Sequence, residues 1–296
     1  MWAEIAFPML KGQLRCKYGI HHQRYKRVLE AFRETKVLLS LLLKYIISTR
    51  FHLQFIDWST YNSMLYKNCK LTKKIFRFFT LANFREAHRV THQDKQRALE
   101  YFENHAVVYS KKVTKGPLSL LRNIERNAVL KFAKLDEPGA SMIDMGTGSG
   151  FYALKAKEAG MIVHAMDASP GMLSLLQDRV DMLYHADIDS FQIKKTFDRV
   201  VCAGVLDFVI NPEGALKNLC QLVAPGGRLV ILVPRNGLGG QFYRLEKLIL
   251  NTRVNLYSIQ WLESKALVYG LHLMNHAKPL PTNLVALFER PRTDIF

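Results

Sequence analysis

The stretch IDMGTGSG (143–150) decides the fold of this 296-residue chain. It ends a short apolar run, 141–144, and precedes a run with helical spacing, 151–159. Glycines between a strand end and a helix start let the backbone turn tightly and let a ligand approach it closely. The spacing is GxGxG, because the third glycine of the dinucleotide-binding pattern GxGxxG would fall on Phe151. We therefore expect a strand, a ligand-binding loop and a helix at this point of the chain.

Strand and helix patterns alternate around this loop. Continuous apolar runs predict strands at 141–144, 161–166, 182–186, 197–203, 228–233, 271–277 and 283–289. Apolar residues at three-to-four spacing predict helices at 117–135, 151–159, 171–179 and 211–223. Asn211 is a suitable N-cap for the last of these helices, with Pro212 at its first position. The predicted fold class is α/β, a Rossmann-like, doubly wound, mostly parallel seven-stranded sheet with an N-terminal helical, basic extension.

The positive charge of the chain is concentrated at its beginning. The whole chain has 42 Lys and Arg against 25 Asp and Glu, a formal charge of +17. Residues 1–90 hold 17 basic against 5 acidic residues, and residues 91–296 hold 25 against 20. The first 90 residues also hold 15 of the 32 aromatic residues but only two glycines. We expect two parts: 1–90, a basic, aromatic-rich helical extension of unknown role, and 91–296, the α/β domain.

Several roles for residues 1–90 stay open. The segment opens without the pattern of a signal peptide, and its most apolar stretch, 37–48, is interrupted by Lys44 and is too short to span a bilayer. It could pack on the main domain, lie on an anionic membrane surface, or grip nucleic acid. It could also lie outside the working protein. Deleting residues 1–85 would separate these roles.

The four cysteines predict the compartment. Cys16, Cys69, Cys202 and Cys220 show no CxxC spacing and no dense framework. Neither a disulfide scaffold nor a cysteine-based zinc site is expected, and Cys202 and Cys220 fit a buried strand and a helix core. A reducing, cytoplasmic compartment is the prediction, with a membrane-peripheral location as the alternative.

Five motifs in order resemble the class I S-adenosylmethionine-dependent methyltransferases, over about residues 98–290. The first glycine loop is followed by stretches similar to the second, third and fourth motifs of that family and to its late helix–turn–strand. These are IDMGTGSG (143–150), AMDASPGML (165–173), ADIDSF (186–191), FDRVVCAGVLDFV (197–209) and LVAPGGRLVILVP (222–234). The resemblance implies a methyltransferase that uses S-adenosyl-L-methionine.

The resemblance also implies a set of cofactor-binding residues. Asp167 would accept both ribose hydroxyls, Asp187 would accept the adenine amino group, and Ile188 would pack on the adenine ring. Ala203 and Gly204 would end a strand beside the sulfonium. The full set is Tyr109, Asp144, Gly146, Thr147, Gly148, Gly150, Asp167, Ala168, Met172, Asp187, Ile188, Ala203 and Gly204.

Each acid in this set has an alternative. Asp144 could instead fix the glycine loop by accepting backbone N–H bonds. Asp189 could take the place of Asp187, and Asp167 could be only a helix cap or a turn residue.

An upstream stretch narrows the branch of the family. YFENHAVVY (101–109) is similar to the leading helix of the ubiquinone-biosynthesis, biotin-pathway and magnesium-protoporphyrin methyltransferases. In that small-molecule branch the helix covers the cofactor, and its tyrosine, here Tyr109, lies near the methionine moiety. The alternative is an ordinary amphipathic helix that buries Phe102, Ala106 and Tyr109 on one face.

The acceptor is expected to be a small, apolar or aromatic molecule. Residues 203–208 (AGVLDF) lack the Asn/Asp-Pro-Pro-Tyr/Phe tetrad of enzymes that methylate exocyclic amines, and no carboxylate cluster indicates a metal. In this family a segment before the last two strands commonly shapes the acceptor pocket. Here that segment contains Phe242, Tyr243, Tyr257, Trp261 and Leu262. The alternative is that these residues pack in the core and contact no substrate.

No general base is assigned. Five residues could serve if the acceptor is a hydroxyl or a ring carbon: His105, Tyr109, Asp207, His272 and His276. Two other functions stay open, an RNA-directed methyltransferase that uses the basic N-terminal part and a cofactor-binding, inactive partner subunit. Nucleic acid is not the expected partner, because most of the charge lies outside the α/β domain; the oligomeric state is not predicted.

Overall fold

The computed structural model describes residues 89–114, 117–249 and 251–292, and of residues 107–114, 117, 118 and 249 it describes the backbone only. The chain divides into two compact units, Met1–Leu81 and Ala82–Phe296. The expectations for residues 1–88, including Cys16 and Cys69, lie outside the described residues, and the division at residue 90 stays a prediction. Within the described ranges, no helix combines the length and the apolar character needed to cross a membrane.

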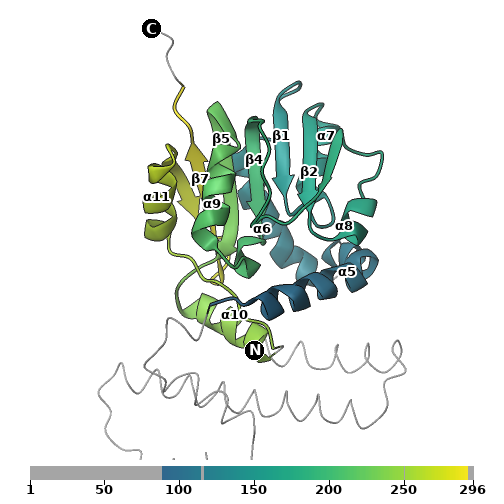
Figure 1. Ribbon diagram of the computed structural model, residues 1–296, viewed down its shortest axis with the longest axis vertical. Coiled ribbons are helices and arrows are strands. Elements are labelled where there is room, and N and C mark those ends of the chain that lie inside the picture. The colour runs from purple at the N-terminus through teal and green to yellow at the C-terminus, as the bar shows by residue number, and fades with distance from the viewer. Residues whose placement is uncertain (1–88, 115–116, 250, 293–296) are drawn as a thin grey trace, which may run out of the picture. The chain divides into compact units, whose positions relative to one another are not determined.

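Seven strands of the described residues form one sheet, in the order β3-β2-β1-β4-β5-β7-β6 (Figure 1). All neighbouring pairs are parallel except β5–β7 and β6–β7, which are antiparallel. The strands are β1 (Ser141–Met145), β2 (Ile162–Asp167), β3 (Met182–His185), β4 (Phe197–Ala203), β5 (Val223–Pro234), β6 (His272–Ala277) and β7 (Asn283–Glu289). The predicted seven-stranded, mostly parallel sheet is confirmed.

Helices cover both faces of the sheet (Figure 1). On one face, α6 (Pro117–Ala133) and α7 (Phe151–Glu158) bury side chains such as Val129 and Ala153 against the strands. On the other, α9 (Pro212–Gln221) and α11 (Ile259–Val268) bury side chains such as Leu219 and Leu262. The remaining elements of the described residues are α5 (His92–Thr114), α8 (Pro170–Ser174), the short 3-10 helix η1 (Leu206–Phe208) and α10 (Leu238–Ile249).

Two elements differ from the sequence prediction. The helix expected over 171–179 ends at Ser174, and Asp178 takes a left-handed φ of 58°, a conformation that a helix interior does not allow. Strand β5 begins at Val223, before the turn at 225–227, because Val223 already pairs with Phe197. A register shift in β4 between Phe197 and Arg199 takes up the extra residues.

The topology gathers loops at one edge of the sheet. The carboxyl ends of the parallel strands β1, β2, β3 and β4 lie at the same edge, and α5 and α10 lie across it in Figure 1. The chain leaves β1 toward β2 on one side, while β4 lies on the other. Ligands of doubly wound sheets bind at such a switch point, outside the carboxyl ends of the strands.

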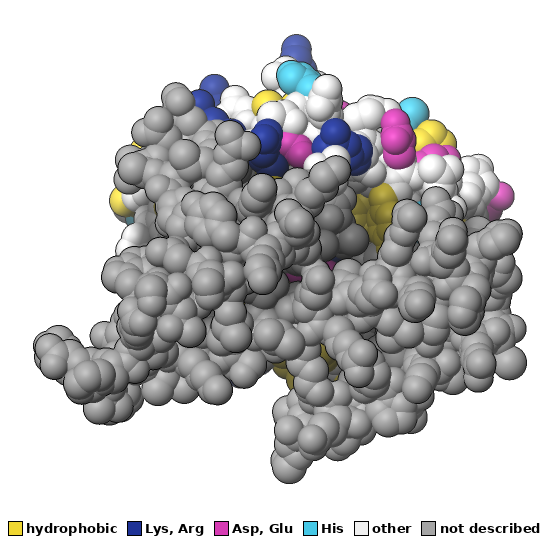
Figure 2. Space-filling model, turned by 90° about the horizontal axis from the view of Figure 1, so that it is seen from below, with side chains coloured by type: hydrophobic (Ala, Val, Ile, Leu, Met, Phe, Trp, Pro, Cys, Tyr) yellow, Lys and Arg dark blue, Asp and Glu magenta, His cyan; other side chains and the backbone are white. Residues whose placement is uncertain are grey.

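The view from below, toward this edge, shows mixed charge where described residues are visible. Lys and Arg side chains lie next to Asp and Glu side chains there (Figure 2). This visible part of the surface therefore carries no field of a single sign.

Candidate functional site

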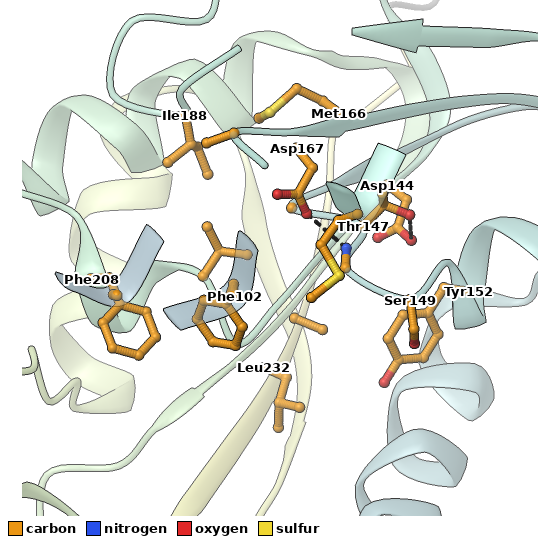
Figure 3. Close-up of a pocket in the computed structure, with 18 of the residues that line it drawn as sticks. Phe102, Asp144, Thr147, Ser149, Tyr152, Met166, Asp167, Ile188, Phe208 and Leu232 are labelled. Atoms are coloured by element: carbon orange, nitrogen blue, oxygen red, sulfur yellow. Dashed lines mark hydrogen bonds between the residues drawn. The ribbon is translucent and has the colours of Figure 1, made fainter. Parts of the chain in front are cut away.

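A cavity lies at the carboxyl ends of β1, β2 and β4, and α5 and α6 complete its wall (Figure 3). Eleven of the thirteen residues predicted to bind the cofactor line it: Asp144, Gly146, Thr147, Gly148, Asp167, Ala168, Met172, Asp187, Ile188, Ala203 and Gly204. These residues come from four separate loops. The fold therefore brings residues from separate sequence motifs together around one cavity.

The first two glycines of the loop have different surroundings. The backbone N–H groups of Gly146 and Thr147 both donate to the Met166 carbonyl, at 2.7 and 2.9 Å, and so tie the loop to β2. A Cβ on Gly146 (φ 74°) would lie 2.1 Å from Cγ2 of Val205. A Cβ on Gly148 (φ 52°) would meet nothing within 4 Å. Gly146 thus allows close packing, whereas Gly148 leaves its backbone open to the cavity.

Asp144 makes the loop-fixing contacts that its alternative role predicts. Its side chain is buried and accepts from the Thr147 hydroxyl at 2.9 Å and from the Ala153 backbone N–H. Burial raises the pKa of this carboxyl to about 7. Asp144 also lines the cavity, so both roles stay compatible with its position.

Asp167, at the end of β2, has spare acceptor capacity. Its Oδ2 accepts from the Gly148 N–H at 2.8 Å and its Oδ1 from the Ser169 N–H at 2.9 Å. The Ala168 N–H is a further backbone donor to this carboxylate. A carboxylate has about four lone-pair positions, so Asp167 keeps acceptor capacity for a ligand. Burial raises the pKa of Asp167, and the nearby Glu103 raises it further. The residue that caps α8 is Ser169, whose hydroxyl accepts from the Met172 N–H, so Asp167 is not the helix cap.

Asp187 and Asp189 are distinguished by their partners. Asp187 Oδ1 accepts from Lys95 Nζ at 2.5 Å and from the Asp189 N–H at 2.9 Å. The carboxylate of Asp189 accepts from Lys95 as well, and from the N–H groups of Ile210 and Asn211. Only Asp187 lines the cavity, and its Oδ2 makes no hydrogen bond with the described residues. This geometry favours Asp187 over Asp189 as the acceptor for a ligand.

The far part of the cavity is apolar. The rings of Phe102 (α5) and Phe208 (η1) lie edge to face, with centroids 6.0 Å apart, and Leu232 of β5 lies below them (Figure 3). Val205 and Val209 extend this surface.

Charged residues of α6 form another wall. Glu125 is buried and accepts from Arg122 Nη1 at 3.1 Å and from the amide of Asn283, and burial raises its pKa. The guanidinium of Arg126 lies 4.0 Å from the centre of the Phe151 ring. All three α6 residues line the cavity, together with Tyr152.

Sequence reasoning missed Lys95 and these α6 residues. The available signal was weak: Arg122, Glu125 and Arg126 stand at helical spacing within a helix that was identified from its apolar residues alone.

Two predicted cofactor residues are not among the described residues that line the cavity. Gly150 is not on the cavity wall; a Cβ there would lie 2.2 Å from Cδ2 of Leu176, so glycine (φ 78°) allows the start of α7 to pack on the core. The contact with Leu176 gives Gly150 a structural role, and its assignment to the cofactor set stays a prediction. The side chain of Tyr109 lies outside the described residues, although its backbone belongs to α5.

The aromatic residues of 241–270 support the site from behind. None of the described residues of this segment lines the cavity, which favours the core-packing alternative for its aromatic residues. Instead, the Tyr257 hydroxyl donates to the Leu206 carbonyl at 2.7 Å, and the Tyr243 hydroxyl donates to Asp207 at 2.9 Å. They hold η1, which in turn presents Phe208 to the cavity.

The candidate bases do not converge on the cavity. His272 and His276 are exposed on β6, at the opposite end of the sheet from β2 and β1. His105 stacks on Tyr101, with ring centroids 4.6 Å apart. Asp207 is buried, and burial raises its pKa to about 6, but it does not line the cavity. Within the described ranges, no cluster of three or more His, Cys, Asp and Glu residues could hold a metal ion.

Comparison with known families identifies the central part of the chain. Residues 143–231 match the family described as "Methyltransferase domain". The mitochondrial ubiquinone biosynthesis O-methyltransferase of Schizosaccharomyces pombe is 32% identical over 103 residues, which are 31% of this chain and 37% of that protein. The ubiquinone biosynthesis O-methyltransferase of Xanthomonas oryzae is 28% identical over 107 residues, 33% of this chain and 45% of that protein. The chain thus matches less than half the length of these curated relatives.

Solved structures share the fold. Magnesium protoporphyrin IX methyltransferase from Synechocystis, with bound S-adenosylhomocysteine, has a TM-score of 0.53 at 15% identity and covers 67% of this chain and 99% of that one. The N-methyltransferase NodS from Bradyrhizobium japonicum has a TM-score of 0.52 at 16% identity, with coverages of 66% and 98%. At these identities the likeness shows the fold. Together with the domain match, it confirms the resemblance to class I methyltransferases that the motifs indicate.

Proposed function

We propose that this chain, whose residues 143–231 match a methyltransferase domain, transfers a methyl group from S-adenosyl-L-methionine to a small, apolar or aromatic acceptor. The observation that carries the proposal is Asp167. Its two carboxylate oxygens are held by backbone N–H groups and keep acceptor capacity for a ligand, in a cavity beside an open glycine backbone. Such a carboxylate suits the two vicinal hydroxyls of a ribose.

The other residues of the cavity fit the remaining parts of the cofactor. Met172 and Ile188 are buried apolar residues that would face the adenine ring, and Asp187 Oδ2 would accept from its amino group. A Cβ at Gly148 or at Gly204 would meet nothing within 4 Å, so both backbones leave room for a ligand.

The relatives and the apolar wall together support the choice of acceptor. The curated relatives are named as O-methyltransferases of ubiquinone biosynthesis. Phe102, Phe208 and Leu232 offer an apolar surface next to the expected cofactor site. An aromatic acceptor that packs on Phe102 and Phe208 would lose its water shell as it binds.

The expected reaction is an in-line displacement. S-Adenosyl-L-methionine supplies a methyl group on a cationic sulfur, and the sulfur leaves as a neutral thioether. The chain's own residues would contribute by orienting both partners and by excluding water, because α5 and η1 cover the cavity with Phe102 and Phe208. We assign no general base, and we expect alignment of the two partners to provide most of the rate.

The proposal is tested by measuring S-adenosylhomocysteine formation with a panel of phenolic and quinol-like acceptors, with RNA, and with no acceptor. Wild type and Asp181→Asn are expected to turn over a small aromatic acceptor equally, since Asp181 pairs with Lys157 outside the cavity. Asp167→Asn should raise the KM for the cofactor at least tenfold.

Three results would contradict the proposal. Turnover of RNA alone, with a steep loss of rate in salt, would support the RNA-directed alternative. Cofactor binding without turnover of any acceptor would support an inactive partner subunit. Equal kinetics for Asp167→Asn and Asp181→Asn would remove the observation on which the proposal rests.

A further inference from the structure

Helix α5 contributes one side of the cavity wall through a single helical face. Lys95, Ala98, Leu99 and Phe102 line the cavity, at spacings of three and four residues. All other cavity-lining residues come from the loops of the sheet edge, from α6, α7 and α8, or from the strand ends. Whether this side of the cavity is closed therefore depends on what holds α5 in place.

One polar contact joins α5 to the loop after β3. Lys95 Nζ donates to Asp187 and to Asp189, and its side chain is 12% exposed, against 36% and 18% for the two acids. The carboxylate of Asp187 is also the group expected to accept a hydrogen bond from the adenine amino group. Lys95 thus fixes both the helix and a ligand-binding side chain.

A second polar contact joins α5 to the loop after β2. Glu103 accepts from the Ser169 hydroxyl and, at 3.0 Å, from the Gly171 N–H. These two donors lower the pKa of Glu103, which keeps its carboxyl ionised. The backbone N–H of Ser169 donates to Asp167, the expected ribose acceptor. A chain of hydrogen bonds therefore runs from α5 to the second cofactor acid.

The apolar contacts of this part of α5 are limited among the described side chains. Ala98 and Ala106 are buried, and both are small. Leu99 and Phe102 are half-buried, and Phe102 packs edge to face on Phe208. The amino end of the helix is held by further polar contacts: the Arg253 N–H donates to Asp94 at 3.1 Å, and Arg97 donates to the Asn251 carbonyl at 2.8 Å. Charged contacts near the surface weaken as salt screens them, whereas apolar burial does not.

We propose that Lys95 and Glu103 are positioning residues that clamp α5 over the cofactor cavity and thereby set the rate at which cofactor and product leave it. The inference rests on the proposed function. Because the clamp closes on Asp187 and on the Ser169 turn beside Asp167, opening it would free the helix and loosen both acids together.

The test compares S-adenosylhomocysteine dissociation by stopped flow in Lys95→Met, Glu103→Gln and wild type. Each substitution is expected to raise the dissociation rate constant about tenfold, as the loss of one charge-assisted hydrogen bond would. The association rate constant should change less than threefold. Lys95→Arg should restore most of the wild-type rate. A variant that combines Lys95→Met with Glu103→Gln should respond less to salt, so added salt should speed up dissociation more in wild type than in this double variant.

The matched control is Lys157→Met. Lys157 of α7 also pairs with an aspartate, Asp181, at 2.6 Å, but it does not line the cavity. Its dissociation rate should stay within twofold of wild type. Unchanged dissociation in Lys95→Met and Glu103→Gln, or an equal rise in Lys157→Met, would overturn the proposal.

A second readout separates this inference from the proposed function. Hydrogen exchange of the α5 amides 96–106, measured without ligand, should be faster in the two variants, while the α7 amides 154–158 stay unchanged. Unchanged exchange in α5 would overturn the clamp even where the chain binds cofactor. If exchange is faster in the variants but the wild-type chain binds no S-adenosylhomocysteine, the proposed function and the control of release are overturned. Only the role of Lys95 and Glu103 in attaching α5 would then stand.

Discussion

Single residues of the glycine loop have separable tasks. At Gly146 a side chain would collide with Val205, and at Gly150 it would collide with Leu176. At Gly148 a side chain would meet no protein atom and would take up space in front of the loop. The sequence alone treats the three glycines as one motif. Their separation depends on which neighbours the tertiary fold brings to each one, and a local pattern does not contain this information.

Replacing Gly146 should mainly lower stability, whereas replacing Gly148 should mainly weaken ligand binding. Gly146→Ala should lower the free energy of unfolding by about 2–4 kcal/mol, because of the contact with Val205 and the left-handed φ. Gly148→Ala should cost about 1–2 kcal/mol of backbone strain but weaken S-adenosylhomocysteine binding at least tenfold. Urea unfolding and titration calorimetry measure the two effects. Similar losses of stability in both variants would contradict this division.

The buried carboxyl of Asp144 should make stability depend on pH. Because its pKa is raised from 3.8 to about 7 in the folded chain, the fold holds this proton more tightly than the unfolded chain does. The resulting stabilisation is fully present below pH 4 and is lost as pH rises through 7. Asp144→Asn keeps an acceptor oxygen but cannot titrate. Between pH 5 and 8, wild type should lose about 1–3 kcal/mol of unfolding free energy relative to Asp144→Asn. Parallel stability curves would contradict the raised pKa.

At the scale of elements, η1 is held from behind by the segment that follows β5. Tyr243 and Tyr257 hydrogen-bond to it, and the Asn255 amide donates to the Leu206 and Val209 carbonyls. The sequence predicts that the aromatic residues of this segment shape the acceptor pocket. The structure assigns them to the support of a loop, because hydrophobicity alone does not distinguish a ligand-facing side chain from one that packs inside the fold.

Removing one of these contacts should destabilise the fold without touching the cavity. In Tyr243→Phe, Asp207 would lose its Tyr243 partner, and its Oδ1 already has no hydrogen bond among the described residues. The expected cost is about 1–3 kcal/mol, because a buried carboxyl is left unsatisfied. Tyr184→Phe, which removes a hydroxyl next to His164, is the control and should cost less than 1 kcal/mol. Chemical unfolding measures both; equal costs would argue against a structural role for Tyr243.

The sequence predicted much of the architecture at this scale. The strands from β1 to β7 lie within a few residues of their predicted ranges except at the start of β5, since continuous apolar runs and turn residues are local signals. Eleven of the thirteen predicted cofactor residues line one cavity, because the motifs follow strand ends and all parallel strands end at one edge. Lys95 and the charged residues of α6 escaped prediction, since the face that a helix turns toward a cavity is set by its partners.

On the scale of the whole molecule, the formal charge of +17 is spread unevenly along the chain. Most of it belongs to residues 1–90, and the acids Asp144, Asp167 and Asp187 line the cavity of the second unit. The two buried apolar clusters of the described residues lie entirely between Val129 and Phe288. We therefore expect the second unit to form its core from its own residues.

A chain that starts at Ala82 should accordingly fold alone. We expect its thermal midpoint to lie within 3 °C of the full chain, on the order of a ΔΔG below 1 kcal/mol, and its affinity for S-adenosylhomocysteine to stay within twofold. Calorimetry of both chains checks these values. Loss of cofactor binding on deletion would show that residues 1–81 take part in the site.

The most direct test of the account is titration calorimetry of S-adenosyl-L-methionine into wild type, Asp167→Asn and Asp181→Asn. We predict one site per chain in wild type, the same affinity in Asp181→Asn, and at least tenfold weaker binding in Asp167→Asn, because two hydrogen bonds to an ionised carboxylate are weakened. No binding by a wild-type chain that is folded by circular dichroism would contradict the central claim that this cavity holds the cofactor.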